Sequence, residues 1–360
     1  GDHRYLHSFP TRRSSDLLAG FTFAQDAPLW MRHSIISPDG TTIAFTYKGD
    51  IYTVPVAGGR AMQITTNPAY DTAPVWSPDS KRIAFASDRM GSLDVYIVAK
   101  DGGEPRRLTT HSGSETPLAF TDAGHVLFSA GIMPSAEAVV FPSNGQFNQV
   151  YRVSVEGGRP TMISSMPMEC ISINKEGAML YQDKKGYEDY WRKHHVSPIA
   201  RDIWMYTPGK EPQYRQLTTF GGEDREPVWA PDGKTFYYLS EENGSFNIYR
   251  RTPGDAKAVQ LTHYTKNPVR YLSAATDGRL CYGFDGEIYT LLPGGEAQKV
   301  NISIVSDRND KDIIRQIKSS GATEMAVSPD GKEVAFVLRG DVYVTSVEYK
   351  TTKQLGRAHV

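Results

Sequence analysis

The feature that most constrains this chain is a repeated unit, which is clearest at residues 75–96. There a Ser-Pro-Asp-Ser turn at residues 77–80 separates two short apolar runs, and proline and aspartate at these positions favour a tight turn. Residues 82–86 and 94–98 have the apolar, β-branched and aromatic composition of strands. A meander of a few short strands cannot bury its own faces in water. The unit therefore requires neighbours of the same kind.

Further copies of this unit carry the same pieces in the same order: a Ser-Pro-Asp-Gly turn, an apolar strand, an Asp-Ile-Tyr strand and a Leu-Thr ending. Strong copies begin at Ser37, Ser77, Trp229 and Ser328, and weaker copies begin at Phe120, Ile173 and Thr276. The spacing of roughly 40 to 55 residues is that of four-stranded propeller blades. Glycine-rich hairpins without a helical period favour closure into a ring over a linear solenoid. We therefore predict an all-β chain: a six-bladed β-propeller of four-stranded antiparallel blades, followed by the truncated start of a second propeller.

The repeats also predict the division of the chain into domains. Six complete copies occupy residues 25–304, which we predict to form the closed ring. The pattern then changes to a charged stretch without proline, and residues 305–321 are predicted to be a connector. A fresh repeat at residues 322–355 is predicted to be the first part of a second propeller. A single seven-bladed ring is the alternative, against which the charged connector argues.

Both ends of the chain contain segments that we exclude from the fold. Residues 1–17 resemble a translated sequencing adapter, and residues 356–360 resemble the opposite adapter, so both are expected to be artefacts and the parent protein to be longer. Residues 18–24 are predicted to be the remnant of a signal peptide, with cleavage before Gln25; an apolar lead-in strand is the alternative. We accordingly expect an exported, periplasmic protein, with a cytoplasmic location as the alternative.

Composition argues against several classes of partner. The net charge is −1, so no nucleic-acid or anionic membrane partner is expected. The chain has no apolar run long enough to span a bilayer. Its two cysteines, Cys170 and Cys281, lie on strand-like runs in different repeats, where buried free thiols are expected rather than a disulfide.

No catalytic or metal-binding motif is present in the sequence. The chain has no Gly-x-Ser-x-Gly elbow, no His-Glu-x-x-His and no phosphate-binding glycine loop. The repeated aspartates recur once per repeat at a turn, so we interpret them as turn residues and not as calcium ligands. The adjacent pair His194 and His195 would point to opposite faces of a strand, which argues against a metal site. No catalytic residue, metal or cofactor is expected in this chain.

Two stretches are candidates for binding a partner or a peptide. The first is a long excursion at residues 182–201, which mixes aromatic and basic side chains, a combination common at binding surfaces: Tyr187, Tyr190, Trp191, Arg192, Lys193 and His194. The second is an ion-pair cluster formed by Glu223, Asp224 and Arg225, which gives a polar rim for a peptide amine or carboxylate if it faces the channel. Two alternatives remain open: the excursion packs on its own blade, and the cluster is solvated at an outer edge.

The repeated pieces are similar to the blades of TolB-type and tricorn-type propellers, over residues 29–355. Three stretches resemble exported bacterial relatives of the tricorn protease more specifically: residues 183–195 (DKKGYEDYWRKHH), residues 222–225 (GEDR) and residues 238–241 (YLSE). The order of a six-bladed ring followed by a second propeller is also similar to tricorn.

This resemblance implies that the chain is the non-catalytic propeller portion of a tricorn-like serine peptidase, gating or guiding peptides to or from the proteolytic chamber. It implies peptides or unfolded polypeptides as partners, C-terminal PDZ and peptidase domains in the parent chain, and assembly of the parent as a homo-oligomer. The family's catalytic motifs are absent here, so no catalytic residue is assigned by the resemblance. The alternatives are a TolB-type exported scaffold that binds protein partners, the propeller of a prolyl-oligopeptidase-like hydrolase, and a free-standing sensor or lectin-like propeller.

Overall fold

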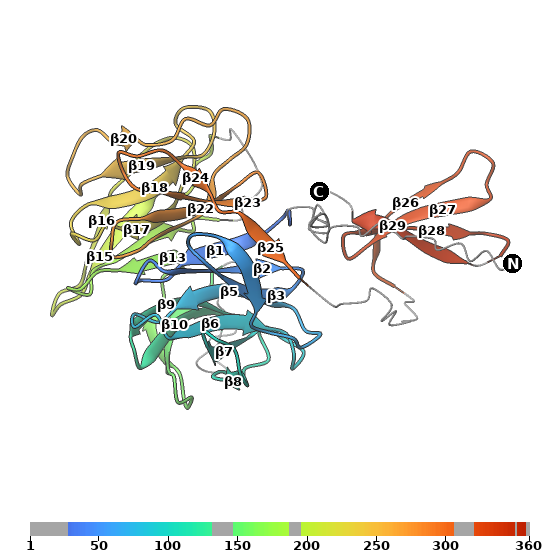
Figure 1. Ribbon diagram of the computed structural model, residues 1–360, viewed down its shortest axis with the longest axis horizontal. Helices are drawn as coiled ribbons and strands as arrows, with labels where there is room; N and C mark the ends of the chain where they lie inside the picture. Colours follow the sequence, from blue (N-terminus) through green and yellow to red (C-terminus); the bar gives the residue numbers. More distant parts are fainter. Residues whose placement is uncertain (1–27, 132–146, 187–195, 306–319, 350, 358–360) are drawn as a thin grey trace, which may run out of the picture. The chain divides into compact units, whose positions relative to one another are not determined.

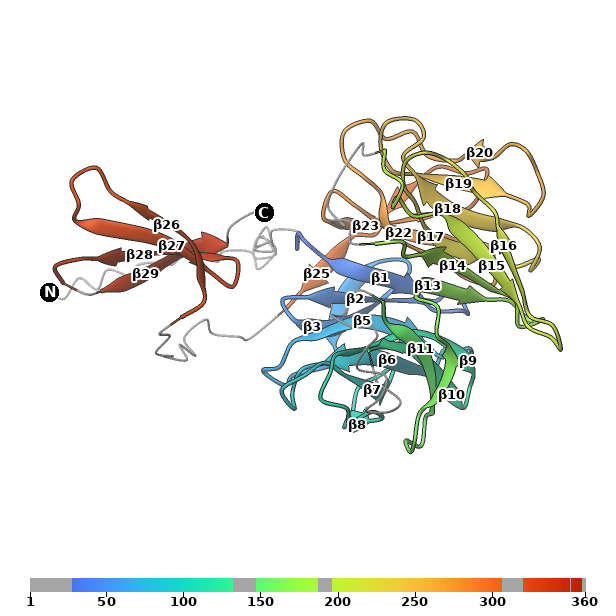
Figure 2. The ribbon, with the colours of Figure 1, turned by 180° about the vertical axis from the view of Figure 1, so that it is seen from behind.

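The computed structural model describes residues 28–131, 147–186, 196–305, 320–349 and 351–357. These residues form β-strands joined by turns and loops (Figures 1 and 2). The chain divides into two compact units, Gly1–Val305 and Ser306–Val360, which we describe separately. Within the described residues there is no helix of the length and apolarity that crossing a bilayer requires.

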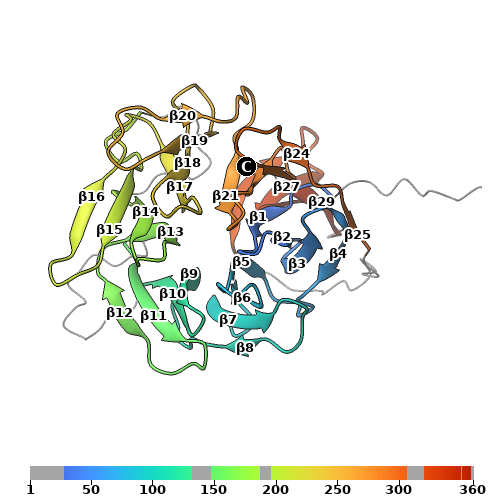
Figure 3. The ribbon, with the colours of Figure 1, turned by 60° about the vertical axis from the view of Figure 1, so that its left-hand side comes forward.

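The first unit is a ring of six blades, each a four-stranded antiparallel meander that follows the order of the chain (Figure 3). The first strand of each blade is innermost: β1, β5, β9, β13, β17 and β21 surround the axis of the ring. The predicted all-β fold class of four-stranded antiparallel propeller blades is thereby confirmed.

The first three blades are built as follows: β1 (Arg32–Ile36), β2 (Thr42–Tyr47), β3 (Asp50–Pro55) and β4 (Gly59–Gln63); β5 (Asp71–Trp76), β6 (Arg82–Ser87), β7 (Asp94–Ala99) and β8 (Arg106–Arg107); β9 (Glu115–Asp122), β10 (His125–Ala130), β11 (Gln149–Ser154) and β12 (Thr161–Ser164). The next three blades are built as follows: β13 (Met168–Ile173), β14 (Met179–Asp183), β15 (Ile203–Thr207) and β16 (Gln213–Gln216); β17 (Asp224–Trp229), β18 (Phe236–Ser240), β19 (Asn247–Arg251) and β20 (Val259–Gln260); β21 (Arg270–Ala274), β22 (Leu280–Phe284), β23 (Glu287–Leu291) and β24 (Gln298–Lys299).

The repeated Ser-Pro-Asp turns are held by their own side chains. In blade one the Ser37 hydroxyl donates to Asp39 Oδ1 at 2.5 Å, and the same carboxylate oxygen accepts the backbone N–H of Thr41 at 3.0 Å. Ser77 and Asp79 repeat the first contact in blade two at 2.5 Å. The hydrogen bond from the Ser77 hydroxyl lowers the pKa of Asp79 below its ordinary value. These contacts confirm that the repeated aspartates hold turns.

The repeated Leu-Thr ending positions the outermost strand of a blade against the third strand. The Thr65 hydroxyl oxygen accepts the backbone N–H of Ile51 at 3.0 Å. The same contact is made by the corresponding threonines of blades two, four and five, at 2.9 Å in each: Thr109 with Val95, Thr218 with Ile203, and Thr262 with Ile248. A short outer strand with few ladder hydrogen bonds gains a fixed register from this contact.

The hydrophobic core lies between neighbouring blades. Phe45, Phe85 and Phe128 occupy the same position in the second strands of blades one to three and are fully buried. Each stacks on a tyrosine of the third strand at 5.7–5.9 Å between ring centroids. One apolar cluster joins blade two to blade three and another joins blade one to blade six. Each blade therefore depends on both of its neighbours for burial of its faces.

The ring closes between blade one and the segment that follows blade six. Strand β25 (Ile302–Ile304) pairs in parallel with β4, the outermost strand of blade one, so that Ile302 lies opposite Gly59. The backbone N–H of Gly59 donates to the Asn301 carbonyl at 2.8 Å. Nearer the axis, the backbone N–H of Ile36 donates to the Ser273 hydroxyl at 3.1 Å. Chain segments more than two hundred residues apart are thus joined at both the inner and the outer edge of blade one.

The second unit contains one further four-stranded sheet, formed by β26 (Ala322–Val327), β27 (Glu333–Leu338), β28 (Asp341–Ser346) and β29 (Thr352–Arg357). Its Ser328 turn and its stacked pair Phe336 and Tyr343, at 5.5 Å, repeat the features of the ring blades. Its faces are uncovered, since Met325 is 74% exposed and Tyr349 is 73% exposed. Strand β29 includes Gly356 and Arg357, which belong to the adapter-like segment of the sequence.

Gly58 provides a test of ring closure, because a Cβ atom there would lie 2.5 Å from the Asn301 carbonyl oxygen. We expect Gly58→Ala to lower the melting temperature more than Gly102→Ala. Both glycines have nearly the same positive φ, +85° and +89°, so both variants share the backbone strain of roughly 1 kcal/mol or more. At Gly102 the nearest neighbour of the added methyl group is 3.9 Å away. Equal losses in thermal denaturation followed by circular dichroism would show that the β25 contact does not hold the ring.

Candidate functional site

The topology gathers the longest inter-strand segments on one face of the ring. The six innermost strands all begin at this face, which we call the start face, and end at the opposite face, where the Ser-Pro-Asp turns lie. In an antiparallel meander the hairpin between the second and third strands returns to the end at which the first strand begins. The chain therefore leaves β10 at Ala130 and β14 at Asp183 on the start face and re-enters β11 and β15 there.

The structure describes one of the two predicted binding stretches. Residues 187–195 lie outside the described residues, and with them Tyr187, Tyr190, Trp191, Arg192, Lys193 and His194. Glu223, Asp224 and Arg225 lie at the beginning of β17, on the start face, and are 4%, 1% and 2% exposed. They belong to the innermost strand and the residue before it, not to a solvated outer edge.

Buried and partly buried charged side chains of this face form a series of ion pairs of alternating sign from blade four to blade five. Lys184 Nζ lies 3.3 Å from Glu169 Oε1, and Arg201 Nε lies 3.2 Å from the other oxygen of Glu169. The chain continues through Glu223, whose two carboxylate oxygens lie 3.4 Å from Arg201 Nη1 and 2.7 Å from Arg225 Nε. Because Glu169, Arg201 and Glu223 each have an oppositely charged neighbour on both sides, the cost of removing them from water is offset by their ion pairs.

The Arg225 end of this chain packs on an aromatic ring. The guanidinium carbon lies 5.2 Å from the centroid of Phe246, which belongs to the hairpin between β18 and β19. A cation above a ring face is attracted by the ring's quadrupole, most strongly when both are desolvated. This contact fixes Arg225 against its own blade.

Hydrogen bonds extend the charged chain to blade six. Gln182 donates to Glu169 Oε2 at 3.0 Å and accepts the backbone N–H of Glu226 at 3.0 Å. Glu226 in turn accepts the backbone N–H of Leu272, on the innermost strand of blade six, at 2.8 Å. Charged and polar side chains at the start face therefore tie three consecutive innermost strands together.

A backbone irregularity recurs at one level of the innermost strands. Five of these strands contain a register shift at which a non-glycine residue adopts a left-handed conformation with φ between 50° and 59°: His33, Ala73, Cys170, Glu226 and Tyr271. Blade three has a register shift at the same level, near Leu118. A β-bulge re-aims side chains, and a left-handed residue with a side chain costs of order 1 kcal/mol or more. Surrounding packing must stabilise this arrangement in each blade.

Burial controls the ionisation of these inner residues. Burial, with a smaller contribution from the neighbouring Arg32 guanidinium, lowers the pKa of His33 to about 4, so the imidazole is neutral near pH 7. The His33 ring contacts that of Tyr271 at 4.9 Å between centroids. Burial and the carboxylates of Glu226 and Glu169 raise the pKa of the Cys170 thiol well above its ordinary value, which disfavours the nucleophilic thiolate. The residues at the register shifts are therefore uncharged apart from Glu226, whose side chain accepts a backbone hydrogen bond from Leu272.

Two carboxyl groups at the start of innermost strands have raised pKa values. Burial raises the pKa of Asp224 to about 7, with hydrogen bonds to Ser240 and Thr218 acting in the opposite direction. Burial also raises the pKa of Glu115, the first residue of β9, to about 7. Glu169 behaves differently: burial would raise its pKa, but Arg201 and Lys184 outweigh that effect and lower it. The start face thus holds both ionised carboxylates and carboxyl groups that titrate near neutral pH.

Several residues of this site were not predicted from sequence. Glu169 is a lone acidic residue in an apolar strand, and Arg201 closes a long excursion; neither position has a motif that marks it. The sequence feature that could have indicated a charged site here is the polar run at residues 182–185 and 201–202, on either side of that excursion. The described residues contain no group of three or more His, Cys, Asp or Glu side chains arranged to hold a metal ion.

The family model described as the tricorn protease N-terminal β-propeller domain matches residues 28–297. Among curated proteins, the chain is 26% identical over 289 residues to tricorn protease homolog 1 of Streptomyces coelicolor, a match that covers 79% of this chain. It is 25% identical over 333 residues to the tricorn protease of Thermoplasma acidophilum, covering 89% of this chain. The crystal structure of a tricorn protease superposes with a TM-score of 0.67 at 20% identity, covering 91% of this chain and 31% of that one.

The six four-stranded blades and their inner charged face define a β-propeller domain. The chain belongs to the tricorn protease N-terminal β-propeller family. Of the families left open by the repeated pieces, this is the one that the match shows. The chain spans 26% and 29% of the length of the two curated relatives described above.

Asp224 makes the stability of the ring depend on pH. Its ordinary pKa is 3.8 and its folded value is about 7, so the folded state holds the proton through this interval while the unfolded state has lost it. The free energy of unfolding therefore falls as the pH rises from about 4 to above 7. Since a pKa difference of one corresponds to about 1.4 kcal/mol, Asp224→Asn should gain up to about 4 kcal/mol relative to the wild type between pH 4 and pH 8.5.

Urea denaturation of the two proteins at several pH values measures this gain. The matched control is Asp255→Asn, which changes an exposed carboxyl group and should follow the wild type. Glu115 is untouched in both variants, so part of the pH dependence should persist in each. Parallel curves for the wild type and Asp224→Asn would contradict the prediction.

Proposed function

We propose that this chain is the propeller portion of a tricorn-like serine peptidase and that its ring gates or guides extended peptides to or from the proteolytic chamber. The observation that carries the proposal is the ring of register shifts on the innermost strands. It places His33, Ala73, Cys170, Glu226 and Tyr271 at corresponding positions of the innermost strands, in backbone conformations that the surrounding packing must stabilise. Membership of the tricorn propeller family supports the same role.

The chemistry of this level suits an extended chain of varied sequence. Neutral aromatic, thiol and methyl groups at Tyr271, Cys170 and Ala73 offer contacts that do not discriminate strongly between side chains. The raised pKa of Cys170 and the lowered pKa of His33 leave no activated nucleophile or cationic imidazole near pH 7. A surface of this kind holds a passing peptide weakly and does not react with it.

The rest of the proposal concerns the parent protein. The parent carries a peptidase core and a PDZ domain C-terminal to this chain, assembles as a homo-oligomer and is exported to the periplasm. The relatives are several times longer than this chain, which leaves room for such domains. The four-stranded sheet at residues 322–357, with its uncovered faces, fits the first blade of a further propeller.

The role of the axis is tested by a fluorescent reporter on Ala73. In a Cys170→Ser background, Ala73→Cys is labelled with an environment-sensitive thiol dye, and the control label is placed at the exposed outer position by Thr161→Cys. Reduced, carboxymethylated lactalbumin, which is unfolded, should change the emission of the Ala73 label saturably. Folded lactalbumin should not, because its width excludes it from the axis. The proposal fails if the label at Ala73 does not respond, or if both labels or both forms of lactalbumin give the same response.

The 360-residue chain itself should hydrolyse no peptide, because its sequence contains none of the nucleophile motifs described above. Casein and fluorogenic peptides incubated with the purified chain should be cleaved at the background rate. A serine-directed inactivator should leave that rate unchanged. Turnover that the inactivator abolishes would show a catalytic site that the proposal does not contain.

A further inference from the structure

A pocket of about 510 Å³ lies at the seam between blades four and five. It is lined by the segment that connects the two blades, at Thr218 and Phe220, and by the face of blade five, at Asp224, Tyr238 and Tyr249. Its volume is in the usual range for small-ligand sites. The pocket extends outward from the beginning of β17 and is separate from the level of register shifts around the axis.

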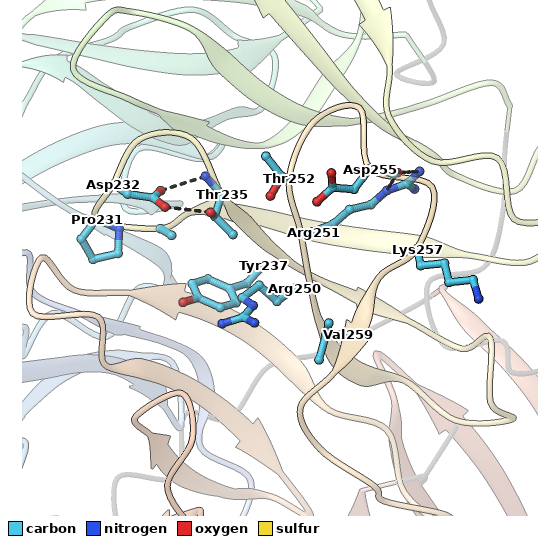
Figure 4. A pocket seen from close by; sticks show the side chains of 11 residues that line it. Pro231, Asp232, Thr235, Tyr237, Arg250, Arg251, Thr252, Asp255, Lys257 and Val259 are labelled. Carbon is cyan, nitrogen blue, oxygen red and sulfur yellow. Dashed lines mark hydrogen bonds between the residues drawn. The ribbon is translucent and has the colours of Figure 1, made fainter.

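A second hollow, of about 460 Å³, lies on the neighbouring side of the hairpin between β19 and β20 (Figure 4). Two of its charged side chains make local contacts. Asp232 accepts two backbone N–H groups and the Thr235 hydroxyl within its own turn. The Arg251 guanidinium donates to the Asp255 carbonyl, as the dashed lines in Figure 4 show. These two side chains are therefore already engaged within the protein.

The seam pocket differs because one of its lining residues, Asp224, has a carboxyl oxygen that lacks a hydrogen-bond donor. Asp224 is 1% exposed, and its Oδ1 atom has no hydrogen-bond partner among the described residues. A buried acceptor without a donor costs about 1–3 kcal/mol, and more when it is charged. Protonation relieves part of this cost, and a ligand that supplies a donor relieves it as well.

The other walls of the pocket favour a cationic donor. Glu242 adds a second carboxylate at the exposed mouth, and it is one of the groups that raise the pKa of Asp224. Tyr238 and Tyr249, with centroids 5.8 Å apart, supply aromatic surface of the kind on which ammonium groups bind. Two carboxylates with aromatic walls suit an organic cation better than a hard metal ion, which takes six or more oxygen ligands.

The cationic side chains of the pocket make no ion pair with its two carboxyl groups among the described residues. Arg251 and Lys257 also line the pocket, but Arg251 is held by the Asp255 carbonyl. Within the described parts of the chain, no ion pair joins either cation to Asp224 or Glu242. Neither carboxyl group is therefore occupied by a direct ion pair with these two cations.

We propose that the seam pocket binds the ammonium group of a peptide, supplied by a lysine side chain or by an amino terminus, with Asp224 as its principal acceptor and Glu242 as its second. The site goes beyond passage along the ring axis and does not require it. It gives the start face a fixed attachment point for peptides that carry a positive charge, beside the innermost strands rather than among them.

Calorimetric titration of the 360-residue chain at low salt tests this proposal. The probes are the blocked peptide acetyl-Ala-Lys-Ala-amide, its norleucine analogue, which lacks only the charged nitrogen, and unblocked Ala-Ala-Ala-amide. The lysine peptide should bind at least about tenfold more tightly than the norleucine peptide, since a desolvated charge pair is worth more than 1.4 kcal/mol. Comparing the lysine peptide with the unblocked peptide shows which source of the ammonium group the pocket prefers.

Two variants assign the binding to the pocket. Asp224→Asn keeps the shape of the side chain and should weaken binding of the lysine peptide at least about tenfold, whereas Asp255→Asn, outside the pocket, should leave it unchanged. Glu242→Gln alters an exposed hairpin residue that the fold does not depend on, and should weaken binding about threefold, as expected for a partly screened charge. If circular dichroism shows Asp224→Asn to be unfolded, the Glu242→Gln result decides.

Three results would overturn the proposal: no detectable binding at millimolar peptide, equal affinity for the norleucine peptide, or undiminished binding by the folded Asp224→Asn and Glu242→Gln variants. Because none of these measurements uses the ring axis, a failure here leaves the Ala73 reporter result standing, and the reverse also holds.

Discussion

Every part of this structure depends on the inability of a single blade to cover its own faces. A four-stranded meander presents two apolar faces, and Phe45 or Phe85 is fully buried only because a neighbouring blade packs on it. The faces of successive blades are covered in turn, until the last face can be covered only by the first blade. Closure is therefore the condition on which burial in all the other blades rests. The parallel pairing of β25 with β4 and the contact of Ile36 with Ser273 meet that condition at the outer and inner edges.

The sheet of the second unit illustrates the same constraint. It has the turn, the stacked aromatic pair and the four strands of a ring blade. However, none of the residues in β26, β27 and β28 is buried. Local sequence is thus sufficient to form the meander, since Ser328 and Asp330 hold their turn as Ser37 and Asp39 do. Burial is a property of the ring and not of the blade.

The charged start face follows a different logic. Charged side chains are tolerated there because neighbouring charges have opposite sign. The ion pairs join Lys184, Glu169, Arg201, Glu223 and Arg225 in that order. Asp224, the residue after Glu223, is not part of this series of ion pairs, and burial raises its pKa. Two adjacent acidic residues at the start of β17 therefore have different roles: Glu223 pairs with Arg201 and Arg225, and Asp224 is a buried group with a raised pKa that lines a pocket. Alternation of side chains between the two faces of a strand is the physical reason.

The sequence by itself determined the blade unit and the family resemblance, because these depend on residues close together in the chain, and it favoured a six-bladed ring over a seven-bladed one. The Ser-Pro-Asp turn, the period of two along each strand and the threonine that fixes the outer strand all act within one repeat. It also drew attention to Glu223, Asp224 and Arg225, but left open whether they faced solvent or the interior. Only the tertiary structure decided that question, since Glu169 and Arg201 come from another blade and no local pattern announces their meeting. The same holds for the left-handed residues His33, Ala73, Cys170, Glu226 and Tyr271: nothing in their identities favours a positive φ, and each lies at a register shift between the first and second strands of its blade, which only the folded sheet defines.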